Sequence, residues 1–322
     1  MPSRFRQIDL SKLDRVSIRD RGGTVDLDDF VDPYAPGPEL DRLLGLVPDL
    51  LAGRDFKAAA AALAAAARAE RTVVVMFGAH VVKCGLSRLL IDLMERGVVT
   101  AVATNGAGAI HDFEIASWGV TSEDVSSGLA AGTFGMCAET ADSMNAAAEE
   151  GRENGWGLGE SLGRALTEAR APNLGTSIIA RAYELGIPAT VHVAIGTDVV
   201  HEHASADGAA IGETSLRDFR IFAEVVRTLE AGAVVNVGSA VILPEVFLKA
   251  LAIARNLGAA ERFTAVSLDM NEPYRAMVNV VSRPTAQTGL GIALRGRHEI
   301  LLPLLWAAVV REVERGGARL SG

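Results

Sequence analysis

The sequence predicts an α/β protein with a Rossmann-like, mostly parallel sheet and helices on both faces. Three observations support this fold class. From Thr72 onward, short runs of β-branched residues alternate with amphipathic helical patterns, which is typical of repeated βαβ units. The chain has 322 residues and is 49% hydrophobic, so it can bury a large core. Glycine-rich loops follow several of the expected strands, where ligands bind in open α/β sheets.

Five strands are expected, each short and rich in apolar residues. In chain order they cover residues 72–76, 98–103, 189–195, 233–237 and 263–270. Amphipathic patterns predict helices at 86–96, 174–185, 216–230, 244–256 and 299–314. Because βαβ crossovers are right-handed, the first two strands are expected to lie in one sheet.

We expect one structural domain with two unequal parts. Residues 1–70 form an N-terminal helical preface, with helical patterns at 39–52 and 55–68. Residues 71–322 form the Rossmann-like domain. Within it, residues 128–173 are helical, polar and interrupted by glycines, which indicates an excursion from the sheet that serves as a lid or an oligomer contact.

Charge and cysteine content exclude several classes of protein. The net charge is −9 at pH 7 with no basic stripe, which argues against a nucleic-acid partner. The N-terminal segment has no apolar run of signal-peptide length, and the alanine-rich run at 58–67 is too short to cross a bilayer. Cys84 and Cys137 cannot form a disulfide framework. We therefore expect a cytoplasmic protein with a small-molecule substrate and no membrane partner.

Three loops after expected strands contain the residues best suited to chemistry. The first, 78–85, places His80 and Lys83 beside glycines. Lys83 is one of only four lysines, so it is a candidate for an anion contact or an imine. The second loop, 104–109, and the third, 237–240, allow a backbone to approach a phosphate closely. None is a complete GxGxxG or Walker motif, but three such loops in one chain favour a nucleotide ligand.

A group of histidines supplies a second candidate site. His192, His201 and His203 lie within twelve residues, together with Asp198 and Glu202. Such a group can act in general acid and base catalysis, hold a metal ion, or lie on a plain loop surface. No HExxH motif or cysteine pair accompanies it, so the leading hypothesis assigns no metal.

The glycine loops and their flanking elements resemble those of the deoxyhypusine synthase family. That family has a strand, a TSNLISSG-type loop, a helix, a second strand and a TTAGG-type loop, in the order of TVVVMFGAHVVKCGLSRLLIDLMERGVVTAVATNGAGAIHD. Two later segments are also similar: SIIARAYELGIPATVHVAIGTD to the family segment that ends near TDG, and GAVVNVGSAVILPEVFLKALAIARNLGA to its GGGVxKH segment. The similarity covers roughly residues 40 to 315.

The resemblance implies the Rossmann-like fold of that family, a homotetramer, and NAD bound near subunit contacts. The implied cofactor-binding residues are Gly78, Ala79, His80 and Cys84, then Thr104, Asn105, Gly106 and Gly108, then Gly238 and Ser239. Asp198 matches an aspartate of the TDG segment.

The chain departs from the family at the residues that act on the substrate. Leu243 stands where the family has its imine-forming lysine, and leucine cannot form that bond. Ile110 and His111 replace the paired acidic residues that recognise a polyamine. These departures indicate a deoxyhypusine synthase-like enzyme that does not modify the usual protein lysine and that takes a neutral or anionic substrate.

The leading hypothesis is an NAD-dependent transferase or oxidoreductase that acts on a small amine or alcohol. In it, His111 or His201 moves the proton, Lys83 contacts an imine or anion, and Asp198 orients one of them. Three alternatives stay open. They are a polyamine aminobutyltransferase of the homospermidine synthase type, with pocket carboxylates such as Glu114, Glu202 or Glu213; a metal-dependent lyase or hydrolase that uses His192, His201 and His203; and a nucleotide-binding protein without catalysis.

Overall fold

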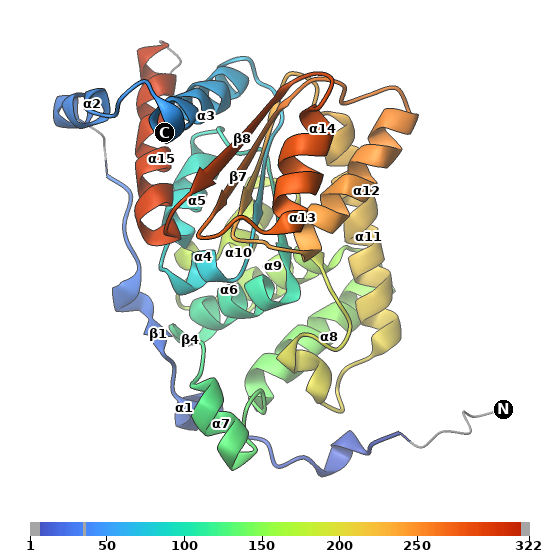
Figure 1. Cartoon of the computed structure of the whole chain (residues 1–322). Coiled ribbons are helices and arrows are strands. Elements are labelled where there is room, and N and C mark those ends of the chain that lie inside the picture. Colours follow the sequence, from blue (N-terminus) through green and yellow to red (C-terminus); the bar gives the residue numbers. More distant parts are fainter. Residues whose placement is uncertain (1–6, 35–36, 317–322) are drawn as a thin grey trace.

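The centre of the molecule is one sheet of six parallel strands, as a computed structural model describing residues 7–34 and 37–316 shows. The strands are β2 (Val73–Phe77), β3 (Ala101–Asn105), β5 (Ala189–His192), β6 (Ala233–Val237), β7 (Thr264–Asp269) and β8 (Leu290–Arg295). They lie in the order β5-β3-β2-β6-β7-β8. Helices cover both faces of the sheet (Figure 1). The predicted Rossmann-like α/β fold is confirmed.

Alternate residues of β2 pack against different helices. Val73 and Val75 belong to a cluster with α3, α5 and α15, whereas Val74 and Met76 belong to a cluster with α11 and α12. All of β2 is buried, because a central parallel strand is covered on both faces. These helices are α3 (Leu51–Arg68), α5 (Ser87–Glu95), α11 (Gly208–Arg227), α12 (Ile242–Asn256) and α15 (His298–Arg315).

A third group of helices packs beside β5. It consists of α6 (Gly106–Trp118), α8 (Ala138–Asn154), α9 (Leu158–Glu168) and α10 (Ile178–Leu185). Leu162 of α9 and Val191 of β5 are fully buried in this cluster. The segment 128–173 is helical as expected, and its helices α8 and α9 extend the core at this edge of the sheet.

The N-terminal segment runs along the outside of the molecule before it reaches α3 (Figure 1). It contains short helical turns at Leu10–Lys12 and Leu27–Asp29, helices α1 (Ile18–Arg21) and α2 (Pro38–Gly45), and β1 (Val25–Asp26). The two residues of β1 pair antiparallel with β4 (Val120–Thr121), which follows α6. The first six residues of the predicted preface lie outside the described residues.

The remaining short elements lie in the connections. They are α4 (His80–Lys83), α7 (Val125–Ala131), the 3-10 helices η3 (Leu174–Thr176) and η4 (Val199–Glu202), and a helical run of α13 (Tyr274–Ala276), the π-helix η5 (Met277–Ser282) and α14 (Arg283–Thr285) before β8.

Three strand predictions differ from the structure for local reasons. Strand β8 was not predicted, because Leu290 and Gly291 are exposed at this edge and no continuous apolar run marks the strand. Strand β3 begins later than predicted, because the N–H of Val98 closes the turn after α5 by donating to the carbonyl of Leu93. Strand β5 ends earlier than predicted, because the N–H of Val193 donates to a side chain rather than to a neighbouring strand.

The strand order creates a switch point between β2 and β6. The chain runs from β2 to β3 and β5 on one side, and then returns to β6, β7 and β8 on the other. In sheets of this order, ligands bind outside the carboxyl ends of the strands, where the order reverses. A Cβ atom added to Gly78, after β2, would lie 2.4 Å from the carbonyl oxygen of Gly238, after β6. The two loops therefore touch at the switch point.

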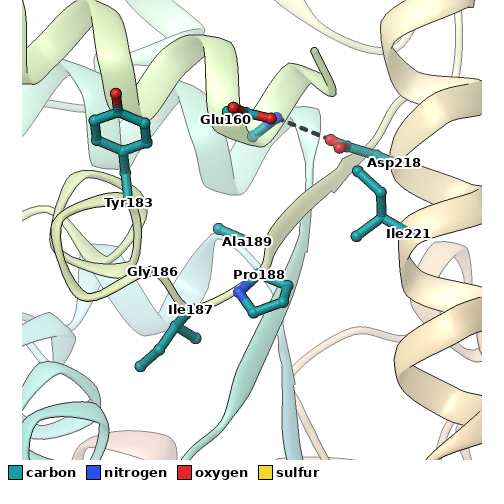
Figure 2. Close-up of a pocket in the computed structure, with 9 residues that line it drawn as sticks. Glu160, Tyr183, Gly186, Ile187, Pro188, Ala189, Asp218 and Ile221 are labelled. Atoms are coloured by element: carbon teal, nitrogen blue, oxygen red, sulfur yellow. Dashed lines mark hydrogen bonds between the residues drawn. The ribbon is translucent and has the colours of Figure 1, made fainter. Parts of the chain in front are cut away.

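A buried carboxylate covers the open side of the edge strand β5. Oδ2 of Asp218 in α11 accepts hydrogen bonds from the N–H groups of Val191 (2.7 Å) and Gly159 (2.8 Å). Ser215, also in α11, accepts one from Val193 (3.0 Å). These side chains supply acceptors that a neighbouring strand would otherwise give. A cavity of about 330 Å³ lies beside Asp218, between α9, α10 and α11, and Pro188 and Ala189 at the start of β5 also line it. Figure 2 shows the residues that line this cavity.

Asp218 makes the stability of the fold depend on pH. Burial raises the pKa of this carboxyl from 3.8 to about 7, so the folded chain keeps a proton that the unfolded chain releases. The contribution of Asp218 to stability therefore falls as pH rises from about 4 to about 7. We expect Asp218→Asn to reduce this fall, measured as the shift of the urea unfolding midpoint between about pH 5 and about pH 8.

The matched control is Asp207→Asn, which changes the N-terminal cap of the same helix at its solvent-accessible end. It should keep the pH dependence of the natural chain. A shift as large in Asp218→Asn as in the natural chain would show that this carboxyl does not titrate in that range.

Candidate functional site

The predicted cofactor-binding residues lie in three neighbouring loops at the carboxyl edge of the sheet. Gly78, Ala79, His80 and Cys84 follow β2; Thr104, Asn105, Gly106 and Gly108 lie at the end of β3 and the start of α6; Gly238 and Ser239 follow β6. Because β2 lies between β3 and β6, its loop is central among the three.

The loop after β3 is held by its own side chains. The hydroxyl of Thr104 donates to the last carbonyl of β2 (2.9 Å), and the side chain of Asn105 accepts from the N–H of Gly108 (2.9 Å), which caps α6. A Cβ atom at Gly106 would lie 1.8 Å from the carboxylate of Asp198. That carboxylate therefore packs on the first turn of α6, where the partial positive charge of the helix favours it.

A cavity of about 220 Å³ lies beside this turn. Three of the predicted catalytic residues line it: Lys83 from α4, His111 from α6 and Asp198 from the loop after β5. Arg21 from α1 and Glu123, just before α7, also line it, and the sequence analysis did not single them out. The local sequence gives no signal for Arg21, because its partner carboxylate is 93 residues further along the chain.

The carboxylate of Glu114 is the centre of a buried polar network on one wall of the cavity. Arg21 donates two hydrogen bonds to it, of 2.8 and 3.1 Å. The hydroxyls of Thr121 (2.7 Å) and Thr140 (2.8 Å) donate to it as well. The Arg21 and Glu114 side chains are only 7% and 2% exposed, so this is a buried ion pair with its remaining lone pairs satisfied. Glu114 is therefore occupied and not free to bind a cationic ligand.

The same network fixes the tautomer of His111. The hydroxyl of Thr121 donates its proton to Glu114, and the same oxygen is hydrogen-bonded to Nδ1 of His111 at 2.7 Å. Because the hydroxyl has only one proton, Nδ1 of His111 must be the donor in this second bond. Nε2 of a neutral ring is then an acceptor. Burial, with smaller contributions from Lys83 and Arg21, lowers the pKa of His111 to about 4, so the imidazole is neutral at pH 7. His111 is suited to accept a hydrogen bond in the cavity, and it is a weak base.

Asp198 is the group in the cavity best suited to take a proton near neutral pH. Burial raises its pKa to about 6, and its nearest partners are distant: the Thr197 hydroxyl at 3.5 Å and Nε2 of His201 at 4.0 Å. Nδ1 of His201 accepts from the N–H of Gly196 (3.2 Å), so a neutral His201 directs its Nε2–H toward the carboxylate. Since a general base works best with a pKa near the working pH, Asp198 fits this role and His201 fits a positioning role.

Lys83 stands at the cavity with its side chain exposed. No ion pair with another described residue engages its ammonium group, in contrast to Arg21. The lysine is thus available to a ligand that enters the cavity.

The three histidines that the sequence places close together do not converge on one ion. The ring of His192 is buried in β5 against Phe222, with centroids 5.3 Å apart. Nε2 of His203 bonds to the carbonyl of Gly135 (2.8 Å). Among the described residues, no potential metal-binding group contains His192, His201 or His203. The reason is that β5 ends at His192, whereas His201 lies in the later turn η4 and His203 follows it, so the three rings are held in different places.

The positions that differ from the deoxyhypusine synthase family have different surroundings. Leu243 lies in the first turn of α12 and is fully buried, so no reactive group replaces the family lysine there. Ile110 and His111 line the cavity. Of the carboxylates considered for a polyamine pocket, Glu213 pairs with Arg217 on the surface (2.9 Å) and does not line the cavity.

Comparisons with known proteins identify the fold. No family model and no curated protein matches the chain. A protein from Methanococcus maripaludis S2, provisionally described as LOR/SDH, shares 14% identity at a TM-score of 0.52, over 89% of this chain and 74% of that one. AgrE in its complex with ornithine and NAD+ shares 13% sequence identity at a TM-score of 0.45, over 81% of this chain and only 33% of AgrE. A provisional deoxyhypusine synthase from Entamoeba histolytica shares 14% sequence identity at a TM-score of 0.42, over 75% of this chain and 76% of that one.

At these identities the similarity shows the fold alone, which is a Rossmann-like α/β fold. Among the residues that the structure describes, no helix is long and apolar enough to span a bilayer.

The buried ion pair is open to a direct test. Arg21→Met leaves the Glu114 carboxylate buried without its counter-charge, and we expect a loss of about 3–5 kcal/mol in the free energy of unfolding. Adding Glu114→Gln should restore most of that loss, because a neutral amide needs no counter-charge. Urea unfolding measures both variants.

Arg19→Met is the control, since Arg19 lies exposed on the same short helix. An equal loss in Arg19→Met, or no recovery in the double variant, would contradict the importance of this pair.

Proposed function

We propose that this protein is an NAD-dependent enzyme of the deoxyhypusine synthase-like group that acts on a small amine or alcohol, as a transferase or oxidoreductase. The observation behind the proposal is the strand order β5-β3-β2-β6-β7-β8, with glycine loops in contact at its switch point. Rossmann sheets of this order bind a dinucleotide across the carboxyl edge, one half on each side of the switch point. The cavity with Lys83, His111 and Asp198 lies at the same edge.

The residues at the switch point fit such a cofactor. Gly78 and Gly238 let their two loops pack directly against each other, and the neighbouring Ala79 and Ser239 carry only small side chains, which suits a loop pair whose backbone contacts a diphosphate. The loop lacks the full GxGxxG fingerprint, and the proposal therefore rests on the topology.

The chemistry divides between the cofactor and the chain. Bound NAD would accept a hydride from the carbon that bears the amine or hydroxyl of the substrate. Asp198 accepts the proton from that amine or hydroxyl, and His201 lies beside the Asp198 carboxylate, with Nε2 at 4.0 Å. His111 accepts a hydrogen bond through Nε2 and orients the substrate. Lys83 contacts an anionic or imine group at the mouth of the cavity.

The charges around the cavity favour an amine. Asp198 and Glu123 both line it, and the proximity of Glu123 helps to raise the pKa of Glu202, so a third carboxylate lies close by. The sequence-based expectation of a neutral or anionic substrate was drawn from Ile110 and His111 alone, without these carboxylates. The same carboxylates support the second candidate, a polyamine aminobutyltransferase, with Lys83 as the lysine that lines the cavity.

Binding of NAD+ is the test of the cofactor. Isothermal titration of the whole chain should give micromolar affinity, and Ala79→Trp, half-buried beside the switch point, should abolish it by filling the crevice. Ala259→Trp is the matched control, since Ala259 is also half-buried but precedes β7 at the amino edge. No binding by the natural chain, or equal loss in both variants, would refute the cofactor assignment.

The assembly and location belong to the same proposal. We infer a cytoplasmic homotetramer with the cofactor near subunit contacts, on the basis of the resemblance to deoxyhypusine synthases. Sedimentation velocity with and without NAD+ should show a single species of four chains, and a monomer under both conditions would refute this assembly.

The pKa of Asp198 sets the expected pH profile. With an amine or alcohol panel and NADH absorbance as the readout, the rate should rise with pH through an apparent pKa of about 6, because Asp198 must be ionised to accept a proton. Asp198→Asn should lower the rate by about 100-fold or more and remove this limb. Glu160→Gln, at the cavity beside Asp218, should leave the profile unchanged. A limb that persists in Asp198→Asn would assign the titration to another group.

A further inference from the structure

Three side chains capable of binding a metal ion meet at the carboxyl edge, outside the cavity described above. One ligand atom each from His80, Cys84 and Glu299 can be chosen so that all three lie within 4.8 Å of one another. Sγ of Cys84 is 3.9 Å from Oε2 of Glu299. We call these three residues the His-Cys-Glu cluster. It comes from two parts of the chain more than two hundred residues apart.

The local fold explains why these side chains converge. Cys84 directly follows α4, and its N–H donates to the carbonyl of His80 (2.9 Å), so the two residues stand one helical turn apart. Residues at i and i+4 face the same side of a helix, which is the spacing that metal-binding helices use for two ligands. Glu299 lies in the first turn of α15, which contacts α4.

The donor types and their spacing fit one ion in particular. Zn–S bonds of about 2.3 Å and Zn–N or Zn–O bonds of about 2.0–2.1 Å put the ligand atoms of a tetrahedral site about 3.3–3.6 Å apart. The 3.9 Å between sulfur and carboxylate oxygen needs only a small side-chain rotation to match. Thiolate and imidazole ligands select zinc over magnesium or calcium, which need mainly oxygen ligands.

A buried histidine beside the cluster is a second, independent indication of a ligand. His298 precedes Glu299 and is only 1% exposed. Its Nε2 lies 3.3 Å from the carbonyl oxygen of Leu268, whereas its Nδ1 has no hydrogen-bond partner among the described residues. Its ring packs edge-on against His80, with centroids 5.5 Å apart at 64°. A buried nitrogen without a partner is costly, and a water bound beside the cluster would supply one.

We propose that His80, Cys84 and Glu299 bind one zinc ion, or a chemically similar divalent ion, at the switch point of the sheet. Three protein ligands leave a fourth position open for water or a small ligand. The site goes beyond the proposed NAD-dependent activity. It turns the side chains of His80 and Cys84 toward the ion and leaves the backbone at Gly78 and Gly238 for the cofactor.

The test is zinc binding by the full chain in competition with a coloured chelator. We expect one zinc per chain. Cys84→Ser and Glu299→Gln should each weaken binding by more than the ~100-fold that loss of an outer partner costs. Glu299 is exposed, so its variant should fold normally. Cys137→Ser is the matched control, because Cys137 bonds with Thr140 and lies outside the cluster.

A second probe reports the ligands directly. Cobalt bound to the natural chain should show a thiolate charge-transfer absorption that Cys84→Ser lacks and Cys137→Ser keeps. The proposal is overturned if the natural chain takes up no stoichiometric zinc, or if Cys84→Ser and Glu299→Gln bind zinc as tightly as the natural chain. NAD+ titration of the same samples is a separate measurement, so either assignment can fail without the other.

Discussion

The Glu114 carboxylate is the point at which the N-terminal segment, α6, β4 and α8 are joined. Arg21 arrives from α1, Thr121 from β4 and Thr140 from α8, and all three donate to this one side chain of α6. A buried carboxylate with this many donors is stable only while all of them are present. The outer segment therefore contributes directly to the wall of the candidate active site, and the tautomer of His111 depends on the same network through Thr121.

Two buried aspartates near the sheet have opposite surroundings. Along the edge strand β5, Asp218 receives two short hydrogen bonds from backbone N–H groups. At the carboxyl edge, Asp198 has only distant partners and borders a cavity. Burial raises both pKa values, yet only Asp198 can exchange its proton with a ligand in that cavity. The carboxylate beside the cavity of Figure 2 is thus engaged by backbone donors, whereas the one beside the smaller cavity is not.

The sequence predicts the parts of this molecule that are set by local patterns. Buried valine runs located β2 and β6, and the glycines after them marked the carboxyl edge where Lys83, His111 and Asp198 meet. Contacts between distant segments gave no such signal. In the sequence, Arg21 is one of several charged residues in a polar stretch, and only the fold places it beside Glu114. Glu299 is similarly an ordinary polar residue of a helix until the fold places it beside Cys84. The edge strand β8 was missed because exposure and glycine remove the apolar pattern.

The contact between Gly78 and Gly238 links the shape of the crevice to the spacing of the two central strands. The N–H of Gly78 continues the ladder by donating to Val237 (2.9 Å), and the space for a side chain at Gly78 is filled by the carbonyl of Gly238. Any larger residue at that position would act as a wedge between β2 and β6, the pair that both halves of the sheet share. A wider crevice for a bulkier ligand group would thus require a change in the sheet itself, and cannot arise by substitution of this loop alone.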